Sequence, residues 1–270
     1  MSGRLILCAT PIGNLGDVPP RLIETLASVD LVYAEDTRRL SKLLTKTGVG
    51  ATVRSYFVGN EAERSEELAG HLARGRSVAL VTDAGTPGIA DPGLSAVRAA
   101  RRVGATVSVI PGPSAVTAAL AVSGFPADRF VFEGFLPRRG AKRALSLTEL
   151  AEETRTVVLF ASPRRIGADL NDLAVHLGED REVCIARELT KLHEEVWWGT
   201  LGEARDRWSE ARGEITVVIA PPAEVAPSPE EGERVARRLL EEGLGASEAA
   251  RRASAVTGVP RREIYRRITS

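Results

Sequence analysis

The chain has 270 residues, of which 43% are hydrophobic and 27% charged, and its 36 basic and 36 acidic residues cancel. This length suits two packed domains with a small appendage, and zero net charge excludes an overall attraction to nucleic acid, so any basic surface must be local. Cys8 and Cys184 lie in apolar runs, which favours buried thiols in a reducing compartment. No signal peptide and no membrane-length apolar run is recognisable, which predicts a cytoplasmic protein.

Strands and helices alternate through the first half of the chain. Apolar runs predict strands at residues 4–9, 31–34, 52–56, 77–81 and 106–110. Amphipathic spacing predicts helices at residues 20–29, 39–47, 60–74 and 94–103, and a small-residue helix begins near Pro113. This alternation is typical of a doubly wound, mainly parallel sheet, which binds ligands at the carboxyl ends of its strands.

The loop between residues 81 and 94 is the strongest candidate for a binding segment. Three glycines allow a ligand to approach the backbone closely, and Asp83 adds a fixed charge. We expect Asp91 to cap the helix that follows. An ordinary strand-to-helix connector could have the same composition, because Gly and Pro are common in such loops.

The second half predicts another α/β domain and a helical appendage. Strands are expected at residues 130–133, 156–160, 182–186, 194–199 and 214–220, in a mixed sheet, and the basic segment 134–143 is expected to be an exposed loop. A proline-rich linker, 221–229, precedes helices at 230–242, 247–257 and 261–268, with Ser247 as a cap and Gly258 as a stop. The predicted division is therefore 1–120, 121–222 and 230–270.

The appendage has six arginines and two glutamates after residue 247, a net charge of 6 − 2 = +4. A compact helix-turn-helix-like unit fits this pattern best, and a solvated dimerisation or capping tail is the alternative.

Several common chemistries lack their motifs. The chain has no G-x-x-x-x-G-K-[ST], no G-x-G-x-x-G after the first strand and no G-x-S-x-G, and its three histidines lack ligand spacing, so we expect no metal. Acidic and basic residues at strand ends remain: Asp36, Asp83, Glu188 and Lys191. They suit a compact, partly cationic ligand and transfer chemistry by positioning.

Six ordered motifs carry a family resemblance. They are Thr10-Pro-Ile-Gly-Asn-Leu-Gly-Asp17, Ala34-Glu-Asp-Thr-Arg38, Asp83-Ala-Gly-Thr-Pro87, Pro111-Gly-Pro-Ser-Ala115, Asp128-Arg-Phe-Val-Phe-Glu-Gly-Phe-Leu-Pro-Arg138 and Ala186-Arg-Glu-Leu-Thr-Lys191. Together they resemble the ribosomal RNA small subunit methyltransferase I family, in the tetrapyrrole methylase superfamily of class III methyltransferases. The resemblance implies a homodimer that binds S-adenosylmethionine in a cleft between two α/β domains. It also implies 2′-O-methylation of a cytidine in 16S ribosomal RNA.

The resemblance also implies the cofactor site, which comes from five segments: Pro11, Ile12 and Gly13; Asp83, Gly85, Thr86, Pro87 and Ile89; Ser114 and Ala115; Phe160; and Ala186. Phe160 and Ala186 would cover the adenosine, although Ile89, Phe160 and Ala186 suit a plain core position equally. The family usually has Tyr-Glu-x-Pro-His-Arg where this chain has Phe160-Ala-Ser-Pro-Arg-Arg165. We therefore assign no catalytic role to that segment.

The hypothesis for catalysis uses three side chains. Asp36 would accept the hydroxyl proton, Lys191 would stabilise the developing oxyanion, and Glu188 would orient Lys191, although these residues could instead brace their loops. The candidate contacts to small-subunit ribosomal RNA, free or in the 30S subunit, are Arg38, Arg138, Arg139, Lys142, Arg143, Arg164 and the terminal arginines. Two alternatives stay open: a small-molecule tetrapyrrole methylase, and a non-catalytic RNA-binding assembly factor.

Overall fold

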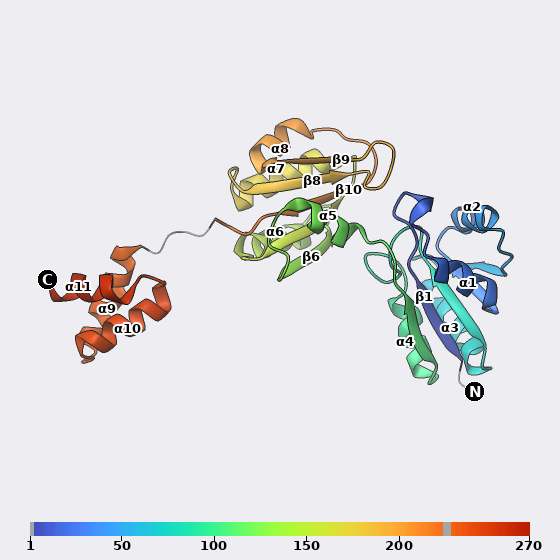
Figure 1. Ribbon diagram of the computed structural model, residues 1–270, viewed down its shortest axis with the longest axis horizontal. Coiled ribbons are helices and arrows are strands. Elements are labelled where there is room, and N and C mark those ends of the chain that lie inside the picture. Colours follow the sequence, from blue (N-terminus) through green and yellow to red (C-terminus); the bar gives the residue numbers. More distant parts are fainter. Residues whose placement is uncertain (1–2, 224–227) are drawn as a thin grey trace. The chain divides into compact units, whose positions relative to one another are not determined.

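The computed structural model describes residues 3–223 and 228–270. The chain forms two compact units, residues 1–221 and 222–270, and each is described by itself (Figure 1). Residues 224–227 of the expected linker lie outside the described residues, and Pro229 already belongs to a helix. In the described part of the chain, no helix is long and apolar enough to cross a membrane.

The first sheet of the larger unit is fully parallel, in the order β3-β2-β4-β1-β5. Its strands are β1 (Arg4–Cys8), β2 (Leu31–Ala34), β3 (Val53–Ser55), β4 (Ser77–Val81) and β5 (Thr106–Ile110). The helices between them are the 3-10 helix η1 (Leu15–Asp17), α1 (Pro20–Ser28), α2 (Thr37–Thr47), α3 (Glu61–Ala73) and α4 (Leu94–Arg102). The doubly wound arrangement predicted from the alternation is confirmed.

Helices cover both faces of this sheet, which explains why its strands are apolar runs. Leucines of α1 and α2 pack on one face, together with Ile6, Cys8, Val32 and Ala79 of the strands. Leucines of α3 and alanines of α4 pack on the other face, and Tyr33 and Tyr56 are buried there with a ring separation of 6.0 Å.

The chain leaves β1 and β4 in opposite directions, because β1 leads to β2 and β4 leads to β5 on the far side of β1. Such a switch point is where open α/β sheets bind ligands. Two backbone hydrogen bonds join the loops that leave these strands: the Thr10 N–H donates to the Gly85 carbonyl at 2.9 Å, and the Gly85 N–H donates to the Thr10 carbonyl at 3.0 Å. The loops after β1 and β4 are thus held as one surface.

The second sheet is mixed, as expected, in the order β6-β7-β10-β8-β9. Only β6 and β7 are parallel neighbours. Its strands are β6 (Phe130–Phe135), β7 (Thr156–Ala161), β8 (Glu182–Arg187), β9 (Glu195–Thr200) and β10 (Ile215–Ile219). Its helices are α5 (Ala115–Ser123), α6 (Ala141–Glu152), α7 (Ile166–Leu177) and α8 (Leu201–Arg207).

Helices α6, α7 and α8 pack on one face of this sheet, and α5 packs on the other against Val158, Cys184 and Val218. The boundary expected at residue 120 therefore falls inside a helix that packs with the second sheet. Pro113 precedes the cap residue of α5, Ser114, instead of beginning the helix. The loop expected at 134–143 is also shorter, because β6 continues to Phe135 and α6 begins at Ala141.

The described residues of the smaller unit form three helices, α9 (Pro229–Glu241), α10 (Ala246–Thr257) and α11 (Arg261–Thr269), around a core of Ala236, Ala250, Ala253, Val259 and Ile264. The expected cap by Ser247 is wrong, because α10 begins at Ala246 after Gly245. The Ser247 hydroxyl instead accepts a hydrogen bond from Arg261 at 2.6 Å. Gly258 ends α10 in the left-handed conformation, as predicted.

Candidate functional site

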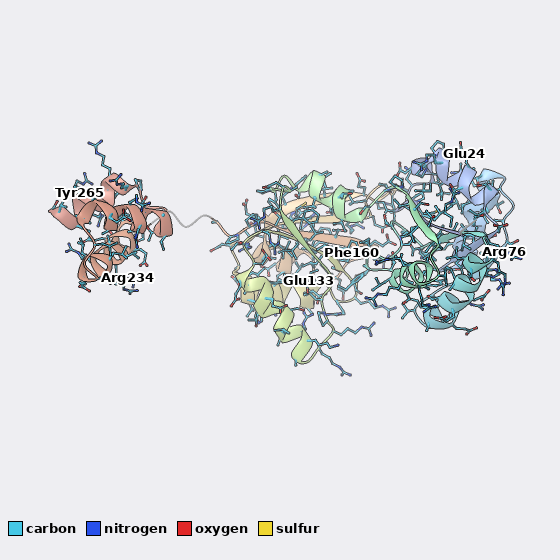
Figure 2. All side chains as sticks on the ribbon, turned by 90° about the horizontal axis from the view of Figure 1, so that it is seen from below. Glu24, Arg76, Glu133, Phe160, Arg234 and Tyr265 are labelled. Atoms are coloured by element: carbon cyan, nitrogen blue, oxygen red, sulfur yellow. The ribbon has the colours of Figure 1, made fainter. Side chains whose placement is uncertain are left out.

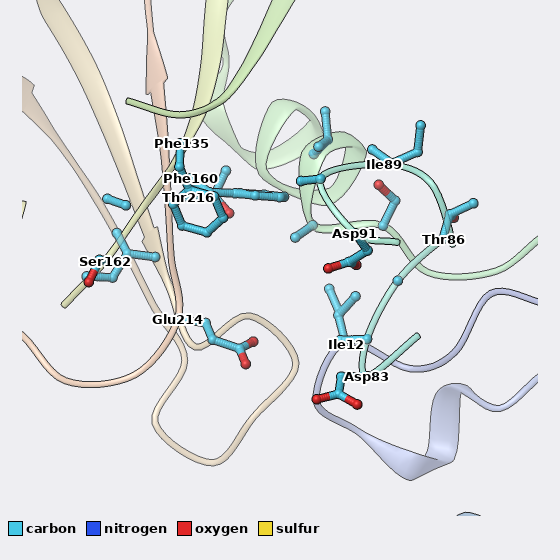
Figure 3. Close-up of a pocket in the computed structure, with 18 of the residues that line it drawn as sticks. Ile12, Asp83, Thr86, Ile89, Asp91, Phe135, Phe160, Ser162, Glu214 and Thr216 are labelled. Atoms are coloured by element: carbon cyan, nitrogen blue, oxygen red, sulfur yellow. The ribbon is translucent and has the colours of Figure 1, made fainter. Parts of the chain in front are cut away.

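A cavity of about 650 Å³ opens at the carboxyl edge of the first sheet (Figure 3). One wall comes from loops of that sheet and the other from the second sheet, so both α/β halves of the larger unit contribute. The lining residues are Ile12, Glu35, Arg39, Asp83, Ala84, Gly85, Thr86, Ile89, Ala90, Asp91, Ser114, Ala115, Val116, Phe135, Phe160, Ala161, Ser162, Pro163, Gly213, Glu214, Ile215 and Thr216. The cavity combines apolar walls with four carboxyl groups and one guanidinium.

The loop between β4 and α4 has a strained and crowded backbone. Ala90 has a φ of 60°, which is uncommon for a residue with a side chain, and Gly93 has a φ of 153°. A Cβ at Gly93 would lie 2.9 Å from the Gly88 nitrogen, so the two segments of the loop touch backbone to backbone. The loop therefore depends on glycine at position 93 to hold Asp91 and Ile89 at the cavity. Backbone strain of this kind is concentrated at functional sites.

Asp91 does not cap α4, and the expectation that it would is wrong. A carboxylate oxygen of Glu61 takes that place, accepting from the backbone N–H groups of Gly93 at 3.3 Å and Ser95 at 3.4 Å. The Asp91 carboxyl group instead points into the cavity (Figure 3). Burial raises the pKa of Asp91 to about 7, and the nearby Glu35, Asp83 and Glu214 contribute to the rise.

Glu35 and Asp83 tie the loops after β2 and β4 together. The Asp83 N–H donates to Glu35 at 3.2 Å, and Asp83 accepts from the Asp36 N–H at 3.0 Å. Asp83 also lies 3.4 Å from Arg39 Nε. Burial raises the pKa of Glu35. These acids hold the loops in place and make the cavity wall negative.

The structure gives Asp36 a local role. Its carboxylate caps α2 by accepting from the Arg38 N–H at 2.8 Å, and both its oxygens pair with the Arg38 guanidinium, at 3.1 and 2.7 Å. These hydrogen bonds hold the pKa of Asp36 well below its usual range. A carboxylate with both oxygens engaged and a low pKa is a poor proton acceptor, so the geometry favours a capping role, and the hypothesis that Asp36 is the base stays a prediction.

Glu188 and Lys191 form the ion pair that the sequence suggested. Lys191 Nζ lies 2.7 Å from Glu188 and 3.1 Å from Glu214. Burial opposes charge on both groups, yet their mutual hydrogen bond prevails, lowering the pKa of Glu188 and raising that of Lys191. The turn is strained, with φ values of 52° at Glu188 and 67° at Thr190. The catalytic role of the pair stays a prediction.

A second cavity of about 320 Å³ adjoins the first and shares Ile12, Glu35, Arg39, Asp83, Ala84 and Glu214 with it. Lys191 crosses directly over Gly13 there, because a Cβ at Gly13 would overlap the Lys191 side chain. The loop after β1 therefore needs glycine at position 13 for this close approach.

The structure gathers most of the expected cofactor residues. Eight line the larger cavity: Ile12, Asp83, Gly85, Thr86, Ile89, Ser114, Ala115 and Phe160. Pro11 and Gly13 line the smaller one. Pro87 is buried in the loop and lines neither cavity, and Ala186, 1% exposed, packs against α5 in the core. Thr216, the partner of Ala186 on β10, reaches the cavity in its place.

The RNA candidates divide into exposed and buried side chains. Arg38, Arg138, Arg139, Lys142 and Arg164 are exposed. Arg143 is not, and its assignment as an RNA contact is wrong. Its guanidinium turns inward from α6 and lies 2.9 Å from Asp169 and 2.7 Å from Asp172 of α7, so it joins two helices.

Sequence reasoning missed several lining residues. Glu35 and Phe135 lie inside motifs that were recognised, and Asp91 lies in the glycine-rich loop, so a signal existed for these three. Gly213 and Glu214 carried no such signal, because only the pairing of β10 brings them to the cavity.

Comparisons with known proteins agree with this architecture. The family described as Tetrapyrrole (Corrin/Porphyrin) Methylases matches residues 4–205, and the RsmI C-terminal HTH domain matches residues 226–269. A protein from Synechocystis sp. named ribosomal RNA small subunit methyltransferase I is 45% identical, over 97% of this chain and 96% of its own length. A protein of the same name from Mycobacterium tuberculosis is 46% identical, over 98% and 94%.

Solved structures share the fold at lower identity. A uroporphyrin-III C-methyltransferase from Thermus thermophilus, complexed with S-adenyl homocysteine, superposes with a TM-score of 0.58 at 20% identity, over 81% of this chain and 97% of its own. A diphthine synthase gives 0.62 at 17%, over 81% and 90%. Fold, full-length relatives and matched family agree: the chain belongs to the tetrapyrrole methylase family and, within it, to the ribosomal RNA small subunit methyltransferase I family.

Proposed function

We propose that this chain transfers a methyl group from S-adenosylmethionine to the ribose 2′-hydroxyl of a cytidine in small-subunit ribosomal RNA. The observation that carries the proposal is the 45–46% identity, over nearly the whole chain, with relatives named ribosomal RNA small subunit methyltransferase I. The two-walled cavity supplies a place where donor and acceptor can meet.

The residues of the larger cavity fit the donor. Phe135 and Phe160 lie 5.5 Å apart between ring centroids and offer an apolar wall for an adenine ring, and the small Gly85 and Ala115 leave room against the backbone. Four carboxyl groups face one guanidinium, a net charge of −4 + 1 = −3 when all are ionised. A sulfonium and an ammonium group are favoured in such surroundings.

When bound, S-adenosylmethionine supplies an electrophilic methyl group on a positively charged sulfur. The chain's own residues then have three tasks. The loops after β1 and β4, joined between Thr10 and Gly85, form a rigid wall that orients the donor. Phe160 and its neighbours on the second sheet exclude water from the other side. Lys191 supplies a cation at the smaller cavity and Arg39 one at the edge that the two cavities share, where we propose that the acceptor oxygen lies.

The smaller unit suits contact with RNA through the outer face of α11. Arg262, Tyr265 and Arg266 are exposed on this helix, Tyr265 at 44%. Tyr265 is labelled in Figure 2. Their spacing of three and four residues places them on one face. Among the described residues, Arg262 and Arg266 have no acidic partner within 4 Å, whereas Arg251 and Arg252 of α10 both pair with Glu248. Free guanidinium groups beside an aromatic ring favour phosphate contact and base stacking.

A charge-matched comparison tests this surface in the full-length chain. The double variant R262A/R266A should bind a small-subunit RNA fragment about ten-fold more weakly, with a shallower salt dependence, while S-adenosylmethionine binding is unchanged. The control R251A/R252A removes the same charge from paired positions and should lose less than three-fold. Equal losses in the two variants would contradict a specific α11 surface.

We also propose that two copies associate through the edge of the first sheet. Val107 and Val109 of the edge strand β5 are 36% and 49% exposed, and both lie on the same face. An edge strand with exposed apolar side chains favours pairing with another chain. Sedimentation should give a dimer for the wild type and a monomer for V107K/V109K, while a wild-type monomer at micromolar concentration would contradict the proposal.

The reaction is tested by methyl incorporation. With labelled S-adenosylmethionine, label should enter the RNA of 30S subunits, and mass mapping should place it on one cytidine ribose. The same assay on naked 16S ribosomal RNA shows whether methylation requires the assembled subunit. A porphyrinoid acceptor separates the tetrapyrrole alternative, and S-adenosylmethionine binding without transfer to any acceptor would favour an assembly factor.

A further inference from the structure

The acids at the cavity differ in what they already hold. Asp83 accepts a backbone hydrogen bond and pairs with Arg39, Glu35 accepts from the Asp83 N–H, and Glu214 pairs with Lys191. In the described part of the chain, no group donates a hydrogen bond to the Asp91 carboxyl. Asp91 is thus the cavity acid without a structural duty.

The fold creates this situation by long-range capping. Asp91, Pro92 and Gly93 precede α4 in an order that favours an acidic cap, yet Glu61 of α3 occupies the exposed N–H groups of Gly93 and Ser95. The strained Ala90 and the tight contact between Gly93 and Gly88 hold the loop in a conformation that turns Asp91 toward the cavity (Figure 3). An unpaired carboxyl group held by a strained loop is a feature of functional sites.

We propose that Asp91 accepts the proton of the ribose 2′-hydroxyl during methyl transfer. This inference rests on the proposed function. As the hydroxyl oxygen forms its new bond to the methyl carbon of the donor, the hydroxyl proton moves to a carboxylate oxygen of Asp91. The carbon–sulfur bond breaks and its electron pair stays on sulfur, so charge and atoms balance. The other charged groups that face Asp91 across the cavity are Glu35, Asp83, Glu214 and Arg39.

The surroundings suit Asp91 to this task. Burial and the three neighbouring carboxylates raise its pKa to about 7, so it is a stronger base than an ordinary carboxylate and is still partly ionised at neutral pH. A cation bound in the cavity stabilises the ionised form and lowers the pKa again. Donor binding should therefore ionise Asp91 just before it is needed.

The first experiment compares pH–rate profiles of single-turnover transfer to 30S subunits. Wild type should show a rate that rises with pH and then levels. D91N should be about 10²–10⁴-fold slower and should lack the limb of the profile in which the rate rises with pH. D91E should recover part of the rate. E35Q should keep the limb, and the exposed control D180N should match wild type. In a separate steady-state assay, the KM for 30S subunits should be unchanged in D91N, with the loss confined to kcat.

The second experiment needs no acceptor. Calorimetry of S-adenosylmethionine binding near pH 7, in buffers of different ionisation enthalpy, should show proton release from wild type and much less from D91N, with affinity changed less than ten-fold. If affinity falls as steeply as turnover, or if D91N keeps the acidic limb, the proposal is overturned. Wild type that leaves 30S RNA unmethylated would instead contradict the proposed function, whereas wild-type transfer with a fully active D91N contradicts this inference alone.

Discussion

The loops after β2 and β4 leave neighbouring strands at one edge of the same sheet, yet their aspartates have opposite surroundings. Asp36 is held by the helix it begins and by Arg38, two residues away. Asp91 precedes a helix as well, but Glu61 occupies the helix N-terminus and leaves its carboxyl group unpaired in the cavity. An acid that caps its own helix has its carboxylate oxygens already hydrogen-bonded. When a distant residue caps the helix instead, the nearby acid remains available for chemistry.

The largest expected effect comes from breaking the Asp91 loop. In Gly93→Ala, the new Cβ would lie 2.9 Å from a backbone nitrogen at a φ of 153°, so strain and clash together should cost about 3 kcal/mol of the unfolding free energy. S-adenosylmethionine affinity should fall at least about ten-fold in calorimetry. The control Gly104→Ala, with a φ of 69° and open space, should cost about 1 kcal/mol and leave binding unchanged.

Removing the wall opposite Asp91 should have the next largest effect. Phe160→Ala removes a ring that lies 5.0 Å from Phe132 and 5.5 Å from Phe135, centroid to centroid. Lost contact with an aromatic base costs about 1–3 kcal/mol, so S-adenosylmethionine should bind roughly 5- to 150-fold more weakly. Phe57→Ala, at an exposed position away from the cavity, serves as the control. Unchanged affinity in Phe160→Ala would remove this ring from the donor site.

Asp36 should respond as a helix cap. Asp36→Ala removes the acceptor for the Arg38 N–H and should lower the midpoint of chemical denaturation. Asp36→Asn keeps a capping oxygen and should lower the midpoint less. Turnover should stay within a few-fold of wild type in both. A hundred-fold loss of turnover in Asp36→Asn, with normal folding, would instead support the hypothesis that Asp36 is the base.

The smallest effect has an unusual sign. The pKa of Asp91 rises from 3.8 when exposed to about 7 in the fold, so folding opposes its ionisation and stability falls as pH rises through that interval. Asp91→Asn should therefore stabilise the protein above pH 7, by roughly 1 kcal/mol after allowance for solvent screening, and leave stability unchanged below pH 4. Thermal unfolding at pH 8 and pH 3.5 measures both limits, and destabilisation at pH 8 would show that Asp91 is paired.

The first sheet was predictable because the physics of its strands is local. A strand buried on both faces must be a continuous apolar run, and residues 77–81 agree with the observed β4 end for end. The predicted range 106–110 also agrees with β5, although most of this edge strand is exposed. The glycine-rich loop and the motif acids were recognisable for a related reason, since close backbone approach demands particular residue types. Most of the cavity wall on the first sheet therefore followed from sequence.

The other outcomes depend on contacts between residues far apart in the chain. The sequence around Arg143 does not indicate that its side chain turns toward Asp169 and Asp172. The sequence around Ala186 does not indicate that α5 covers it. The local sequence favours Asp91 as a cap, but Glu61, thirty residues earlier in the chain, accepts the hydrogen bond at the helix N-terminus instead. Which acid is available for chemistry is a tertiary property.

The hydrogen bonds from Gly93 and Ser95 to Glu61 also have a consequence for engineering. Transplanting the glycine-rich loop into another scaffold would carry Asp91 along but leave Glu61, the acceptor that caps the helix, behind. The backbone N–H groups at the start of the helix would then donate hydrogen bonds to Asp91, and its carboxyl group would no longer be available in the cavity. Position 61 is thus a remote switch for the chemistry of position 91, and a designer who wishes to move the activity must move the two as a pair.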